Sequence, residues 1–232
     1  KLGRELAQID VPTVLIVPDP NHHLSNTCKD ICKIEYFTDG IGKMRTTITY
    51  FSHSIYSATH LKALRVIREV NKGLEKVDKT RFGTMYWASY AHLRCLPGIS
   101  ELIATGIIDD KSKLAWFKRM REFHTFELEL QQLCSILEPI ARAINRDGHG
   151  SGSGYETTTV GDIWKFYVAI TAVLHDLFKE NTLSVPLDVQ QEVCGIVNRR
   201  YNEMIHGPSG DLFLSRFFLD PGKFILLLNY LC

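Results

Sequence analysis

The stretch of the sequence with the most suggestive chemistry places cationic side chains directly before aromatic ones. Cations can neutralise a phosphate backbone, and an aromatic ring can stack on an unpaired base, so this pattern is typical of a nucleic-acid contact. Composition alone favours the competing interpretation, in which the aromatic side chains belong to the hydrophobic core. The residues concerned are, in chain order, Lys76, Lys79, Arg81, Phe82, Gly83, Tyr86 and Trp87.

Histidine and cysteine lie close together near the start of the chain. His22 and His23 precede Cys28, and Cys32 follows one helical turn later. Four such ligands could bind zinc, but their spacing matches no known structural finger. Because an unpaired cysteine behaves as a small apolar residue, we interpret both cysteines as core residues and predict no metal site.

Other acidic and nucleophilic residues carry weaker signals. Asp19 and Asp30 could offer oxygen ligands to Mg²⁺, although two carboxylates alone make a weak site, and Asp109 and Asp110 are typical of a helix cap and turn. The sequence contains no nucleophile elbow and no glycine-rich phosphate loop. We therefore predict no catalytic residues and no cofactor.

Composition bounds the class of protein. The chain has 232 residues, of which 45% are hydrophobic and 23% charged, which is enough apolar material for a packed core. Its 27 basic residues nearly balance 26 acidic ones, which excludes coating of nucleic acid by bulk charge but not a local basic patch. Six scattered cysteines suit a reducing compartment. Because the chain starts at Lys1 and shows no leader or bilayer-spanning run, we expect a soluble intracellular fragment.

The hydrophobic pattern predicts a mostly α fold with one short β-strand. The apolar run at 11–17 is bounded by prolines and is typical of a buried strand. A run of glycine and serine at 148–154 is typical of a flexible linker. Periodicity predicts helices over 24–37, 38–51, 57–70, 81–95, 99–104, 114–144 (with Pro139 as a kink or break), 163–178 and 187–206.

Several segments, taken in order, resemble the catalytic half of hAT-superfamily transposases, particularly the fungal branch. The segment 15–31 is similar to that family's strand, its cysteine- and histidine-containing turn and its Asn-x-x-x-Lys-Asp-Ile helix. The segment 79–87 is similar to its Thr-Arg-Trp segment. Further similarity lies at 138–142, 162–166 and 217–221, so the resemblance covers residues 1–221.

The resemblance implies a ribonuclease H-like core that is interrupted by a helical insertion domain. Residues 1–37 would then be a remnant of the core, and 38–232 the insertion domain. Two carboxylates of the family's catalytic triad would precede Lys1 and the third would follow Cys232, so this chain is expected to be catalytically incomplete. Mg²⁺ or Mn²⁺ is expected only for a complete parent enzyme.

The resemblance also implies partners and site residues. The expected partner is DNA at transposon ends, in the nucleus, with no membrane association and with homo-oligomerisation through regions outside this chain. Departures from the family are Asn21 in place of a common cysteine, and Phe82 where many members have tryptophan. The alternative is a domesticated protein-interaction module without DNA activity. The residues expected to bind DNA are His22, Lys29, Lys79, Arg81, Phe82 and Trp87.

Overall fold

The computed structural model describes residues 19–77, 83–109, 113–145, 162–207, 210–212 and 215. Helices account for 81% of these residues, which confirms the mostly α fold class. No strand occurs within the described part of the chain, so the predicted β-strand gains no support from the structure. The strand at 11–17 and the Gly/Ser linker at 148–154 both lie outside the described residues.

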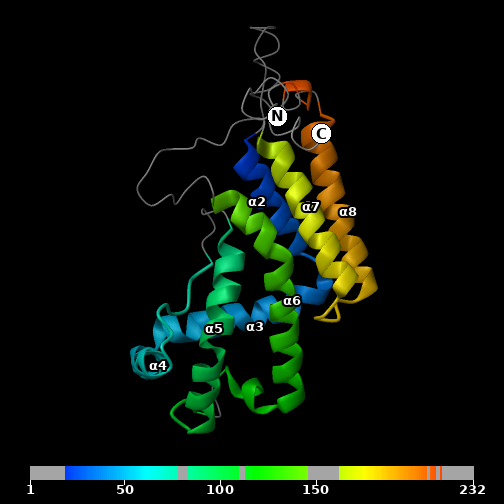
Figure 1. The fold of residues 1–232 in the computed structure, drawn as a ribbon. Helices are drawn as coiled ribbons and strands as arrows, with labels where there is room; N and C mark the ends of the chain where they lie inside the picture. Colours follow the sequence, from blue (N-terminus) through cyan, green and yellow to red (C-terminus); the bar gives the residue numbers. More distant parts are fainter. Residues whose placement is uncertain are drawn as a thin grey trace.

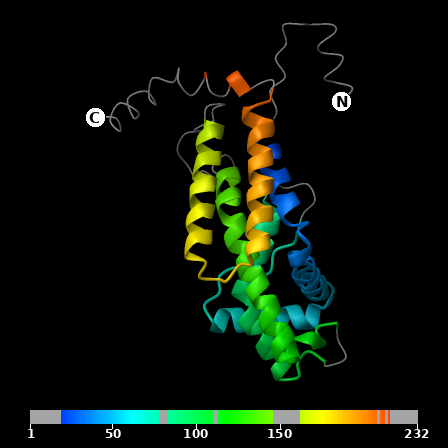
Figure 2. The same ribbon diagram turned by 90° about the vertical axis from the view of Figure 1, so that its right-hand side faces the viewer.

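Seven α-helices and one short 3₁₀ helix make up most of the described chain (Figures 1 and 2). In chain order they are α2 (Pro20–Ile31), α3 (Glu35–His53), α4 (Ile55–Ile67), α5 (Thr84–Ala104), η1 (Ala115–Lys118), α6 (Met120–Asn145), α7 (Asp162–Glu180) and α8 (Leu187–Ile205).

Helix α6 organises the fold because it contacts α2, α3, α5, α7 and η1. Figures 1 and 2 show α2, α7 and α8 beside its C-terminal half, whereas α5 and the crosswise α3 accompany its N-terminal half. Pro139 lies inside this helix without dividing it. The residues around it, Leu137, Ile140 and Ala141, are wholly buried, so packing outweighs the cost of one missing backbone hydrogen bond.

Buried apolar side chains form two clusters, one against each half of α6. The bundle core joins α2, the C-terminal half of α6, α7 and α8, and it includes Leu24, Ile31, Ile140, Tyr167, Leu174 and Val193. The base core joins α3, α4, α5, η1 and the N-terminal half of α6, and it includes Met44, Leu61, Ile99, Leu102, Trp116 and Phe126.

Several predicted helix boundaries were wrong. The predicted helix 24–37 is two helices, because Cys32 caps α2 with backbone bonds and α3 begins at Glu35 rather than Thr38. The predicted break at Pro97 does not occur, because α5 runs through it with both flanking turns packed in the base core. The periodicity of 163–178 predicts Trp164, Val168, Ala172 and Leu174 as its inward residues. On α7, Leu174 is buried together with Tyr167 and Ile170, whereas Val168 is 46% exposed.

Candidate nucleic-acid interface

A groove between α2, α3 and the start of α5 is the strongest candidate site. Its volume is about 560 Å³. Cys28, Ile41 and Met85 contribute apolar lining, and the cationic side chains along it are Lys29, Lys33 and Arg45. We call this cavity the first groove. The described residues that line it include no aspartate or glutamate, so its chemistry is suited to an anionic ligand that also carries an apolar surface.

Helix α2 fixes the position of the two groove lysines. Asp19 caps its N-terminus, where a side-chain oxygen accepts a hydrogen bond of 3.0 Å from the backbone N–H of Asn21, and Pro20 occupies the first turn. Lys29 lies in the last turn of α2 and Lys33 in the turn that directly follows this helix, and both line the first groove. Both are exposed, which leaves their ammonium groups accessible from solvent.

Part of the groove lining comes from the residues on either side of the basic and aromatic segment. Val77 and Gly83 both line the groove and flank residues 78–82, which lie outside the described residues. Gly83 has a φ of 69°, a left-handed conformation that a side chain would disfavour, and it is followed directly by α5. Lys79, Arg81 and Phe82 belong to this segment, so the structure does not describe them.

Two of the groove cations have no ion-pair partner among the described residues. Neither Lys29 nor Arg45 makes an ion pair with a carboxylate in the described part of the chain. Lys33 does, because its Nζ lies 3.1 Å from the carboxylate of Asp30. Cations without an ion-pair partner among the described residues, next to a cavity whose described lining has no carboxylate, are suited to neutralising phosphate.

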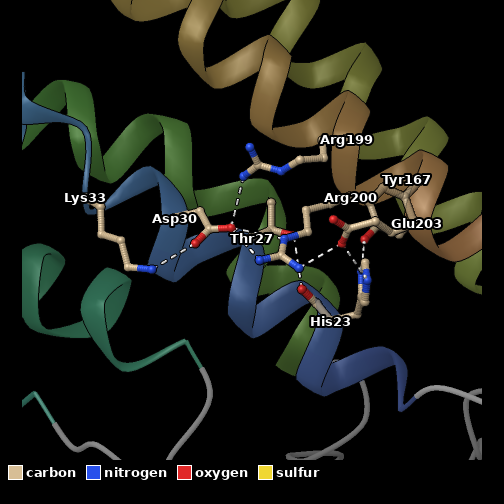
Figure 3. Close-up of polar contacts among 8 residues, drawn as sticks. All are labelled: His23, Thr27, Asp30, Lys33, Tyr167, Arg199, Arg200 and Glu203. Atoms are coloured by element: carbon tan, nitrogen blue, oxygen red, sulfur yellow. Dashed lines mark hydrogen bonds and ion pairs between the residues drawn. The ribbon is translucent and has the colours of Figure 1, made fainter. Parts of the chain in front are cut away.

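Asp30 is shared among three cations beside the groove (Figure 3). In addition to Lys33, Arg199 on α8 lies 3.2 Å from its carboxylate, and Arg200 donates to it through Nε at 3.1 Å and through a second nitrogen. Partial burial acts to raise the pKa of Asp30, but the hydrogen bonds from Arg200 and Lys33 hold it below its ordinary value. Glu203 also pairs with Arg200, so this junction of α2 and α8 holds two carboxylates against three cations and keeps one excess positive charge.

A second set of contacts ties α2 to α7 and α8 behind this junction (Figure 3). His23 Nε2 lies 3.4 Å from the carboxylate of Glu203, which also accepts from Arg200 at 2.8 Å. Glu203 favours a proton on Nε2, so Nδ1 accepts a hydrogen bond of 2.9 Å from the hydroxyl of Tyr167. Burial, followed by the Arg200 charge, lowers the pKa of His23, so the ring is neutral at physiological pH.

The two groove cysteines are expected to be unreactive. Cys28 is buried, as predicted for a core residue, and burial raises the pKa of its thiol strongly. Burial likewise raises the pKa of Cys32 to about 12, against the opposing charge of Arg45. The described residues contain no group of three or more His, Cys, Asp or Glu side chains that could hold a metal ion. The thiols of Cys28 and Cys32 are therefore expected to stay protonated at physiological pH.

The structure brings some of the predicted site residues together and not others. Lys29 lines the first groove, and His22 is exposed on the same face of α2 two turns earlier. Trp87 does not line the groove: it is half-buried, packs against the bundle core and meets the ring of Tyr86 edge-on at 4.8 Å. The structure thus places Trp87 as a packing residue, whereas Lys79, Arg81 and Phe82 lie outside the described residues.

Sequence reasoning missed two groove cations, Lys33 and Arg45. A signal for Lys33 was available, because it follows Lys29 by one helical turn. Arg45 was harder to predict from the sequence, because its place at the groove depends on how α3 crosses α2 and α6.

No known protein family, curated protein or solved structure matches the chain. Among the described helices, none is both long and apolar enough to cross a bilayer.

Proposed function

We propose that this chain is a DNA-binding and catalytically incomplete part of a hAT-type cut-and-paste DNA transposase. The observation that supports this best is the first groove, which is basic and has no acidic residue among its described lining residues. Val77 and Gly83, the described residues that flank the segment 78–82, both line it. That segment holds Lys79, Arg81 and Phe82, which the resemblance independently assigns to DNA. Nuclear localisation and DNA at transposon ends follow from the same proposal.

In this proposal the groove recognises DNA by two kinds of contact. Lys29 and Arg45 bind backbone phosphates as unpaired cations, and Arg81 adds a third phosphate contact. The apolar lining around Ile41 and Met85 accepts a ring or sugar face, with Phe82 as the stacking partner. No step of strand cleavage is assigned to these residues, because the described side chains do not form a carboxylate triad for Mg²⁺ or Mn²⁺.

The direct test is binding to a DNA hairpin and to a nicked duplex, measured by fluorescence anisotropy across a salt series. Up to five cations (Lys29, Lys33, Arg45, Lys79 and Arg81) are available for phosphates. We expect log K to fall with log salt with a slope between about −2.7, for three phosphates neutralised, and about −4.5, for five, at roughly −0.9 per phosphate. A flat response would contradict the proposal.

A second candidate, a protein-interaction module, is favoured by the outer face of α4. Four apolar residues on this helix are strongly exposed, from 61% for Tyr56 to 84% for Ile55, with Val66 at 73% and Ile67 at 75%. At 100° per residue they fall within about 120° of one another, so they form one stripe. Figure 1 shows α4 at the margin of the molecule. Concentration-dependent association that Ile67→Gln removes, together with a flat salt response on DNA, would favour this candidate.

A further inference from the structure

A second groove lies along the C-terminal half of α3. It has a volume of about 460 Å³ and is lined by Arg45, Thr46, Thr49, Tyr50, His53, Ser54 and Lys113. Every one of these side chains carries a cationic, imidazole or hydroxyl group, and the described lining residues include no carboxylate. Lys113 is exposed and, like Arg45, has no carboxylate partner in the described part of the chain.

Hydrogen bonds within the second groove leave a donor available. Ser54 Oγ donates to Ser57 Oγ at 2.9 Å, and Ser57 Oγ donates to the hydroxyl of Tyr50 at 3.3 Å. The Tyr50 oxygen accepts the hydrogen bond from Ser57, so the O–H proton of Tyr50 is used by neither serine. With Arg45 and Lys113, Tyr50 gives the groove three kinds of donor suited to phosphate oxygens.

Arg45 connects the two grooves, because it lines both of them. It belongs to an exposed face of α3 whose members recur at helical spacing: Thr38, Gly42, Arg45, Thr49 and His53. Fifteen residues separate the first from the last, so this face is about 22 Å long at 1.5 Å per residue. One strand of a B-form duplex places a phosphate every ~3.4 Å along the axis, so about six phosphates match that length.

We propose that the second groove is a phosphate-binding site for the same DNA strand that occupies the first groove. The strand follows α3 and contacts Lys29 in the first groove, Arg45 in both grooves and Lys113 in the second groove. This inference rests on the proposed function, and it assigns Lys113, Tyr50 and His53 to DNA although the sequence did not point to them.

Hairpins of two stem lengths test this path. A stem of about four base pairs reaches ~14 Å, which is shorter than the face of α3 of about 22 Å, whereas a stem of about ten reaches ~34 Å and exceeds it. We expect Lys113→Ala to make the salt slope shallower by about 0.9 on the long stem and to leave the short stem unchanged. Lys118→Ala is the control, because Lys118 is a nearby exposed lysine that lines neither groove.

The outcomes separate the two proposals. If Lys29→Ala and Arg45→Ala weaken binding but Lys113→Ala behaves like Lys118→Ala, the strand path is wrong and the proposed function stands. If none of the three variants changes the slope, both proposals fail. Thermal shift with inorganic pyrophosphate provides a second readout. A shift that Lys113→Ala removes, without any effect on the long stem, would assign the groove to a free anion and overturn the strand path.

Discussion

The two halves of the molecule treat buried polar groups differently. In the half built around the bundle core, Arg200 pairs with Asp30 and Glu203, His23 pairs with Tyr167, and Gln132 donates to the carbonyl of Leu183 at 2.8 Å. In the half built around the base core, buried nitrogen and oxygen atoms lack partners among the described residues. These atoms belong to Arg65, His92, Arg94, Ser100, Trp116 and Glu129.

This difference indicates that the bundle half fixes the arrangement of its helices, whereas the base half contains the buried groups that lower stability. A buried polar group without a partner costs about 1–3 kcal/mol, whereas a satisfied network holds its helices in one arrangement. Burial lowers the pKa of His23 in the bundle half and that of His92 in the base half, so both halves are expected to lose stability as the pH falls. The loss is expected to be larger in the base half, where the ring nitrogens of His92 have no partner among the described residues, whereas loss of an ion pair is expected to matter more in the bundle half.

The largest expected effect is acid destabilisation through His92. Its ring is wholly buried, and burial lowers its pKa from 6.5 to about 3. The unfolded chain binds a proton below pH 6.5, whereas the folded chain does not until about pH 3, so stability falls as the pH falls through this window. Between pH 7 and pH 4.5 we expect a loss of about 2–3 kcal/mol, measured by urea unfolding.

The variant His92→Leu isolates this contribution. It has similar volume and no titrating group, so its stability should vary less between pH 7 and pH 4.5 than that of the wild type. At pH 7 it should be more stable by about 1 kcal/mol, because two unpaired ring nitrogens are removed. Identical pH profiles for the two proteins would show that His92 does not set the acid sensitivity.

In the bundle half, Arg200→Met should cost about 2 kcal/mol. The side chains of Arg200 and Asp30 are only 19% and 16% exposed, and the substitution leaves Asp30 and Glu203 without their most buried cation. Arg199→Met is the matched control, because Arg199 makes one contact with the same carboxylate and is 55% exposed. Its cost should be below about 0.5 kcal/mol, and equal losses for the two variants would contradict the comparison.

A smaller effect is expected for Tyr167→Phe. The substitution removes one buried hydroxyl that donates to His23 and leaves the packing of the ring in place, so it should cost about 1 kcal/mol. Tyr56→Phe, at a tyrosine that is 61% exposed, should change the free energy of unfolding by less than about 0.3 kcal/mol. If the Tyr167→Phe protein is as stable as the wild type, the hydrogen bond between Tyr167 and His23 contributes no stability.

The sequence predicted helices better than it predicted their ends and faces. Strong periodicity located α6, α7 and α8, because long amphipathic segments carry the clearest signal. It failed at Pro97, where burial of the neighbouring turns outweighs the proline penalty. It also failed on α7, where Tyr167 turns inward because its hydroxyl has a partner on α2.

For the candidate site, the sequence predicted single residues but not the surface they share. Lys29 was expected at a DNA contact and does line the first groove, whereas Trp87 packs against the bundle core. Arg45 and Lys113 were not expected, because they reach the grooves only through the crossing of α3 and the position of a loop residue. The near-zero net charge concealed that the described residues lining both grooves include no carboxylate.

The most direct test of the central claim compares Arg45→Ala with Arg121→Ala in DNA binding. Each variant removes one exposed arginine and the same net charge, but Arg121 lines neither groove. On a long hairpin titrated across a salt series, we predict that Arg45→Ala makes the slope of log K against log salt shallower by about 0.9 and that Arg121→Ala leaves it unchanged. Equal slopes for the two variants would contradict the assignment of the grooves to DNA.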